Sequence, residues 1–192
     1  MANAHKIASV SEAATALRLG EVIAYPTEAV FGLGCDPDNE QAIQRLLSLK
    51  QRLEQKGLII IAADVGQLAN YIASDQISDE MWLRATSTWP GPVTWLMPAL
   101  PTISKLLTGD HDTVAVRVTA HPVARQLCEH FGKPIVSTSA NISGSIPARS
   151  VEELNQQFNS GLSCIVGGDV NQQASASEIR DLVTNKVIRK ST

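Results

Sequence analysis

Three stretches of the sequence concentrate side chains that bind anions and small polar ligands. The first covers residues 25–34, in which Thr27 and Glu28 follow Pro26, and Gly32 and Gly34 come last. A hydroxyl and a carboxylate beside a rigid proline could fix a small polar ligand, and glycine would let the backbone approach that ligand closely. The same residues also suit a turn in which proline and glycine serve only the geometry of the chain. This stretch alone leaves both interpretations open.

The second stretch is cationic. Lys50 and Arg52 stand two residues apart and Lys56 follows them, at the expected end of a helix that starts at Asp38. Arginine binds phosphate oxygens in pairs and lysine acts as a point charge, so Lys50 and Arg52 projecting into a crevice would form a phosphate clamp. Cations at a helix C-terminus also stabilise the helix macrodipole, so simple helix termination is the alternative.

The third stretch, residues 137–144, holds four hydroxyls and one amide and follows a strand expected to start at Ile135. Such a loop offers donors to phosphate or carboxylate oxygens, or it is a hydrophilic turn whose side chains bond their own backbone. Arg117 lies in an expected strand and alternates with valines. It either points into solvent, as most charged residues do, or faces the crevice and binds a substrate carboxylate.

Other catalytic patterns are missing from the sequence. It contains no GxxxxGK[ST] phosphate loop, no HExxH zinc pair and no GxSxG nucleophile elbow. The three cysteines lie far apart and form no CxxC pair, which argues against a zinc ribbon or a disulfide framework. We therefore expect no metal held by protein side chains.

Helical and strand patterns alternate along the chain and must position these loops. A helix capped by Ser11 is expected through Leu19, and Asp38 with Gln41 or Ser150 with Glu153 would form capping boxes. We expect further helices at 66–72, 79–87 and 122–131, and strands at 22–25, 58–63, 93–97, 113–118, 135–138, 164–166 and 187–189. The run 58–63 is apolar throughout, which predicts a strand covered on both faces. This alternation predicts an α/β domain whose ligands gather beyond strand ends.

The composition fits this fold class. The chain has 192 residues, of which 44% are hydrophobic and 18% charged, and its formal net charge is −3. Proteins that coat nucleic acids are usually basic overall, so the net charge gives no support to a general nucleic-acid-binding role. No stretch approaches the roughly 20 apolar residues that a membrane helix needs. We expect a cytoplasmic protein with no membrane contact.

Taken together, these loops resemble the YrdC-like family of threonylcarbamoyl-AMP synthases. The matching elements occur in the family's order: residues 25–34, the Lys50/Arg52 pair, 89–94, 114–118 with His121 and Pro122, and 137–144. The resemblance is closest to the short bacterial form. It implies a single domain over residues 1–192, with a twisted mixed parallel and antiparallel sheet, flanked by helices, around a concave basic site.

The resemblance also implies an activity. Members of this family combine L-threonine, bicarbonate or CO2, and ATP into threonylcarbamoyl-AMP and release diphosphate, with Mg²⁺ expected on the ATP phosphates. A separate transferase complex then modifies an adenosine next to the tRNA anticodon. Carried over by position, the family pattern puts four residues around threonine, namely Thr27, Arg117, Ser137 and Ser177. It puts six residues around ATP, namely Lys50, Arg52, Lys56, Ser139, Asn141 and Arg189, with Lys50 and Arg52 also catalytic.

Two alternatives stay open at this point. A module that binds double-stranded RNA, tRNA or a ribosome precursor would use the cluster from Lys50 to Lys56, and its binding would weaken steeply with salt. The second alternative is a different carbamoyl- or acyl-adenylate enzyme on the same scaffold. Competition between substrates would distinguish it from an enzyme that uses threonine.

Overall fold

The ten strands of the described residues form one sheet in the order β1-β8-β2-β3-β7-β4-β6-β5-β9-β10. The computed structural model describes residues 5–170 and 177–190. The strands are β1 (Ile7–Ala8), β2 (Ile23–Pro26), β3 (Phe31–Gly34), β4 (Ile59–Ala62), β5 (Val93–Pro98), β6 (Thr113–Val118), β7 (Ile135–Ser139), β8 (Cys164–Val166), β9 (Glu178–Asp181) and β10 (Val187–Arg189). β1–β8, β2–β8, β4–β6 and β5–β9 pair in parallel, whereas β2–β3, β3–β7, β4–β7, β5–β6 and β9–β10 are antiparallel. The predicted mixed sheet is confirmed.

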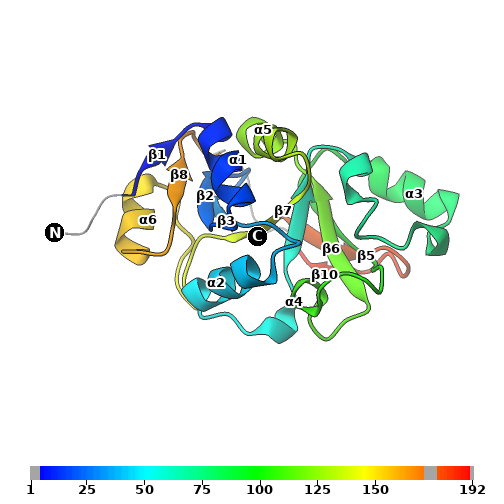
Figure 1. Cartoon of the computed structure of the whole chain (residues 1–192). Coiled ribbons are helices and arrows are strands. Elements are labelled where there is room, and N and C mark those ends of the chain that lie inside the picture. The colour runs from blue at the N-terminus through cyan, green and yellow to red at the C-terminus, as the bar shows by residue number, and fades with distance from the viewer. Residues whose placement is uncertain (1–4, 171–176, 191–192) are drawn as a thin grey trace.

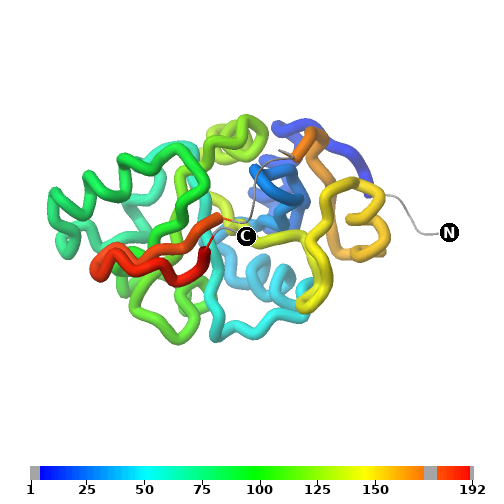
Figure 2. Tube along the Cα trace, turned by 180° about the vertical axis from the view of Figure 1, so that it is seen from behind, coloured from blue at the N-terminus to red at the C-terminus, as the bar shows by residue number. Residues whose placement is uncertain are grey.

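Six α-helices flank the sheet (Figure 1). They are α1 (Val10–Arg18), α2 (Glu40–Lys50), α3 (Asp79–Thr86), α4 (Lys105–Thr108), α5 (Pro122–Phe131) and α6 (Val151–Gln157). Three short 3-10 turns, Glu54–Lys56, Val65–Leu68 and Ser74–Gln76, complete the regular structure of this part of the chain. Figures 1 and 2 place α6, β1 and β8 at one end of the molecule and α3 and β5 at the other, with β7 between them. None of the helices described is long and apolar enough to cross a membrane.

Two hydrophobic clusters lie on opposite faces of the sheet. α1 and α5 cover one face, where Leu17 and Leu127 pack with Ile61. α2 covers the other, where Leu46 packs with Ile60 and Trp95. Ile60 and Ile61 are adjacent in β4 and both fully buried. The prediction of a strand covered on both faces is confirmed, because successive side chains of a strand point to opposite sides.

The N-cap residues of three helices agree only in part with the sequence prediction. Ser150 caps α6 by accepting a hydrogen bond from the Glu153 backbone N–H, as predicted. The predicted cap at Ser11 is wrong, because Ser9 and Glu12 form the reciprocal capping box of α1. Asn39 rather than Asp38 caps α2.

Asp38 has a different role. Its carboxylate accepts hydrogen bonds from the Tyr71 hydroxyl (2.8 Å) and the Lys133 ammonium (2.6 Å), and so links the start of α2 to distant parts of the chain. Sequence spacing alone could not separate Asp38 from Asn39, because both residue types cap helices well.

Residues 25–34 are the main correction to the expected fold. The sequence predicts a loop after one strand, but β2 and β3 form an antiparallel hairpin over residues 23–34, joined by residues 27–30. β3 has the sequence Phe-Gly-Leu-Gly, and glycine is depleted in strands, so its pattern carried little strand signal. β1, α4 and β9 are equally short and were also not predicted. The helix expected at 66–72 is a 3-10 turn over Val65–Leu68.

Two glycines dock the segment after α2 against α4. Gly57 has φ +58° and Gly109 has φ +62°, backbone conformations that side chains rarely adopt. A Cβ on Gly57 would lie 2.7 Å from the Leu107 carbonyl oxygen, and one on Gly109 would collide with the Gln55 backbone. The Leu58 N–H donates to the Leu107 carbonyl (2.9 Å). This close backbone contact fixes the path of residues 52–57.

Replacing Gly109 by alanine should therefore lower the free energy of unfolding by at least about 2 kcal/mol, from backbone strain together with the collision. Urea unfolding measures this change. Gly132→Ala is the matched control, because Gly132 also has a positive φ but a Cβ there meets nothing within 4 Å. We expect the control to cost about 1 kcal/mol. Equal losses in the two variants would mean that the packing of Gly109 against Gln55 contributes nothing.

Candidate active site

A cavity of about 590 Å³ opens where the β2–β3 hairpin, β6, β7 and the β9–β10 hairpin meet. Among the residues that the structure describes, its lining contains four arginines and one glutamate. The lining residues are 27–32, Arg52, Leu58, Ile59, Pro92, Arg117, Ser137, Thr138, Ser139, Ile146, Pro147, Arg149, Ser177 and Arg189. The structure thus brings together seven of the residues singled out from the sequence: Thr27, Arg52, Arg117, Ser137, Ser139, Ser177 and Arg189.

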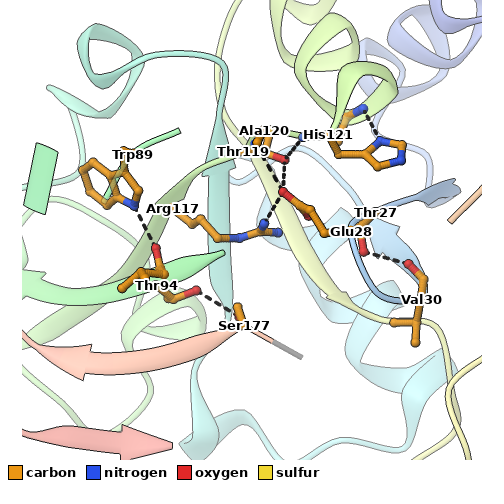
Figure 3. Close-up of polar contacts among 12 residues, drawn as sticks. Thr27, Glu28, Val30, Trp89, Thr94, Arg117, Thr119, Ala120, His121 and Ser177 are labelled. Atoms are coloured by element: carbon orange, nitrogen blue, oxygen red, sulfur yellow. Dashed lines mark hydrogen bonds and ion pairs between the residues drawn. The ribbon is translucent and has the colours of Figure 1, made fainter. Parts of the chain in front are cut away.

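The β2–β3 turn places Thr27 at the cavity. Its backbone N–H (3.1 Å) and its hydroxyl (2.7 Å) both donate to the Val30 carbonyl, which closes the turn (Figure 3). The hydroxyl oxygen keeps its capacity to accept a hydrogen bond from a ligand. A Cβ on Gly32 would lie 3.1 Å from the Thr27 methyl group, so glycine leaves room for that side chain. The geometric and the ligand-binding interpretations of this stretch are therefore compatible.

Arg117 does not point into solvent. It is buried in the cavity wall, and its Nη1 lies 2.6 Å from Oε1 of Glu28 (Figure 3). The same Oε1 accepts hydrogen bonds from the Thr119 hydroxyl (2.8 Å) and the Ala120 backbone N–H (3.2 Å). Burial alone would raise the pKa of Glu28, but the Arg117 charge and these hydrogen bonds outweigh burial and lower the pKa to about 2. Glu28 is therefore a carboxylate throughout the physiological pH range.

Lys50 and Arg52 diverge, contrary to the expectation that both project into the crevice. Gln51 ends α2 in a left-handed conformation (φ +50°), which turns the chain between them. Arg52 lines the cavity and donates to the Gly57 carbonyl (3.1 Å), while its buried Nε has no partner among the described residues.

Lys50 lies behind the lining. It is buried, and its ammonium donates to the backbone carbonyls of Ser139 and of Asn141 (2.8 Å for the latter). Burial, together with the nearby charge of Arg52, lowers the pKa of Lys50 to about 8. In the described structure its ammonium contacts the end of β7 and the loop that follows, and Lys50 is not one of the residues that line the cavity.

Asn141 is used inside the same loop. Its amide donates to the carbonyls of Ile142 and Ser145 (both 2.9 Å), and its Oδ1 accepts from the Ser139 hydroxyl (2.7 Å). Ser139 lines the cavity and Asn141 does not. The Asn141 side chain therefore bonds its own loop, which is one of the two interpretations that the sequence left open. Ser139 is a lining residue of the cavity.

The β9–β10 hairpin completes the cavity. The Ser177 hydroxyl oxygen accepts from the Thr94 hydroxyl (3.1 Å), and Arg189 donates to the Ser177 carbonyl (2.7 Å). Lys56 is exposed in the 3-10 turn Glu54–Lys56 and lies outside the lining.

Sequence reasoning missed Arg149 and gave Glu28 no specific partner. Arg149 directly precedes the cap of α6, where the capping box was the dominant signal. Glu28 and its partner Thr119 are 91 positions apart, a separation that no local pattern reports.

Comparison with known proteins places this chain in a family. The Sua5/YciO/YrdC family model, described as "Telomere recombination", matches residues 15–191. The threonylcarbamoyl-AMP synthase of Vibrio vulnificus strain YJ016 is 49% identical over 184 residues, covering 96% of this chain and 99% of that protein. That of Serratia proteamaculans strain 568 is 53% identical over 175 residues, covering 91% and 92%.

Solved structures share the fold. Sua5 of P. abyssi complexed with L-threonine superimposes with a TM-score of 0.84 at 35% identity and covers 91% of this chain. This chain spans about half (51%) of that Sua5 chain. YciO of E. coli gives a TM-score of 0.83 at 25% identity, covering 95% of this chain and 89% of the YciO chain. The chain therefore belongs to the Sua5/YciO/YrdC family, as its loops predicted.

Proposed function

We propose that this chain is a threonylcarbamoyl-AMP synthase, a nucleotidyltransferase that uses L-threonine, bicarbonate or CO2, and ATP. The observation that carries the proposal is the near-complete match to relatives of about half identity that bear this name. The cavity agrees with it, because four guanidinium groups suit a ligand rich in phosphate and carboxylate oxygens.

The proposed reaction requires oriented substrates and stabilisation of negative charge, and it requires no nucleophile from the protein. Threonine nitrogen adds CO2 to give a carbamate, and a carbamate oxygen attacks the α-phosphorus of ATP while diphosphate leaves. The carbamate is itself the nucleophile, so no Ser–His or Cys–His pair is required. What the cavity contributes is orientation and stabilisation of the developing negative charge.

We assign the lining residues in two groups. Thr27, Arg117, Ser137 and Ser177 surround the threonine, with Arg117 binding its carboxylate. Arg52, Ser139 and Arg189 face the nucleotide and carbamate oxygens.

Three further residues act from outside the lining. Lys50 and Asn141 hold Ser139 at the end of β7 together with the loop that follows, and Lys50 adds a positive charge from behind them. Lys56 contacts the nucleotide from the exposed turn Glu54–Lys56, outside the cavity lining.

Mg²⁺ would arrive on the ATP phosphates. Glu28 is the single carboxylate among the lining residues that the structure describes, and Arg117 already pairs with it. The residues present thus fit a metal held by phosphate and water oxygens, as Mg²⁺ commonly is. Bound there, it would neutralise phosphate charge.

The product would be consumed by a separate transferase complex that modifies an adenosine next to the tRNA anticodon, in the cytoplasm. The alternative, a module that binds double-stranded RNA, tRNA or a ribosome precursor, would use the same arginines on nucleic-acid phosphates.

Diphosphate release by the purified protein tests the proposal. With ATP and Mg²⁺ present, we expect release only when both L-threonine and bicarbonate are supplied. Omitting either one should reduce release to the level without protein. Absence of release, together with RNA binding that weakens steeply between 50 and 200 mM salt, would favour the RNA-binding module instead.

A further inference from the structure

Glu28 offers the cavity a fixed negative charge that the proposed chemistry does not yet use. Among the described residues, the hydrogen-bonded and ionic contacts that other residues make with the Glu28 carboxylate, from Arg117, Thr119 and Ala120, all fall on Oε1. None of them occupies Oε2, and Glu28 is one of the residues that line the cavity. A carboxylate oxygen accepts about two hydrogen bonds, so Oε2 has capacity for a donor on a ligand.

Arg117 and Glu28 together present opposite charges side by side in one buried wall. Their charged atoms are 2.6 Å apart, and β6 and the β2–β3 turn hold them from two directions. The head group of an α-amino acid also carries a carboxylate and an amino group on one carbon atom. The head group can lie beside this ion pair so that each of its charges faces the opposite charge of the protein. Its carboxylate would then contact Arg117 and its amino group would contact Glu28.

We propose that Glu28 is a substrate-binding residue whose Oε2 accepts a hydrogen bond from the α-amino group, so that Glu28 and Arg117 together select α-amino acids over acids or amines alone. The inference rests on the proposed function, since it specifies how the threonine head group is recognised.

The same geometry limits what Glu28 does. Its pKa of about 2 makes it far too weak a base to remove a proton from an ammonium group. Glu28 therefore orients the amino group and leaves deprotonation to another base. Thr119 and Ala120 in turn keep the carboxylate from rotating, because both donate to Oε1.

Binding of two ligands to Glu28→Gln tests the proposal by isothermal calorimetry. The first ligand is L-threonine, and the second is 3-hydroxybutyrate, which keeps the carboxylate and hydroxyl but lacks the amino group. We expect Glu28→Gln to weaken L-threonine binding by about 10- to 100-fold, the effect of losing one hydrogen bond to a charged group. Binding of 3-hydroxybutyrate should change by less than about threefold.

A purely supporting role for Glu28 predicts a different result. If Glu28 only holds Arg117 in place, both ligands should weaken equally, and the proposal is overturned. Unchanged threonine binding in the variant would overturn it as well. Failure of the wild-type protein to bind L-threonine would instead contradict the proposed function.

A second measurement needs no variant and so does not depend on the folding of Glu28→Gln. On the wild-type protein, 3-hydroxybutyrate and threoninol, which lacks the carboxylate, should each bind at least about tenfold more weakly than L-threonine. If 3-hydroxybutyrate binds as tightly as L-threonine, the amino group makes no favourable contact and Glu28 has no part in recognition.

Discussion

Replacing Arg52 by alanine is expected to slow diphosphate release by about 100-fold or more, the usual effect of removing one preorganised donor from an active site. Arg52 lines the cavity, and its guanidinium is held by the Gly57 carbonyl at 3.1 Å. Burial, and then the charge of Arg189, lower the pKa of Arg52. Cations this close repel one another in the free protein. An anionic ligand relieves that repulsion, which favours its binding.

The measurement is the steady-state rate of diphosphate release at saturating substrates. Arg125→Ala is the matched control, because Arg125 is exposed on α5 and forms its ion pair in the described structure with Glu129, one helical turn away. We expect the control to retain the wild-type rate. A rate for Arg52→Ala within about threefold of the control would remove Arg52 from the chemistry.

Replacing Lys50 by methionine should also lower the rate of diphosphate release by about 100-fold. The variant loses the positive charge and the hydrogen bonds from Lys50 to the carbonyls of Ser139 and Asn141. We expect the free energy of unfolding at pH 7 to change by no more than about 2 kcal/mol. The variant loses hydrogen bonds to the loop but no longer buries a charge, and these effects oppose each other. Rate assays and urea unfolding measure the two quantities, with the exposed Lys105→Met as control.

The pH dependence of Lys50 separates function from stability. Its pKa falls from 10.5 to about 8 on folding, so the unfolded chain holds this proton more tightly than the folded one. The contribution of Lys50 to stability is thus fully present above pH 10.5 and is lost as the pH falls through about 8. Its positive charge is present below about pH 8 and is lost above it.

ATP affinity without threonine should therefore weaken as the pH rises above about 8, while the Lys50 contribution to stability increases. Titration of ATP at several pH values measures the first effect without interference from the threonine amine. Lys50→Met should lack this pH dependence. If wild type and variant showed the same pH profile, Lys50 would not be the group responsible.

The sequence predicted the elements that carry strong local signals. The helix Pro122–Phe131 occurs where expected, because its apolar periodicity and Gly132 at its end define it. The strands Cys164–Val166 and Val187–Arg189 occur where short apolar stretches predict them. The β2–β3 hairpin was missed because glycine in β3 masks the strand pattern.

The arrangement of the site depended on features that spacing does not encode. The separation of Lys50 from Arg52 follows from the left-handed Gln51, a conformation that residue type alone does not predict for glutamine. The contact of Glu28 with Arg117 joins the β2–β3 turn to β6, which are distant in sequence, and only the folded sheet brings them together.

The β9–β10 hairpin has a consequence for limited proteolysis. β10 is an exposed strand that pairs with β9, yet it carries Arg189 to the cavity. A protease that cuts the exposed residues 183–186 would break the chain between Arg189 and the rest of the lining, whereas the buried hydrophobic residues of the described chain all lie before the cut. Such cleavage would therefore remove activity without dividing the hydrophobic core.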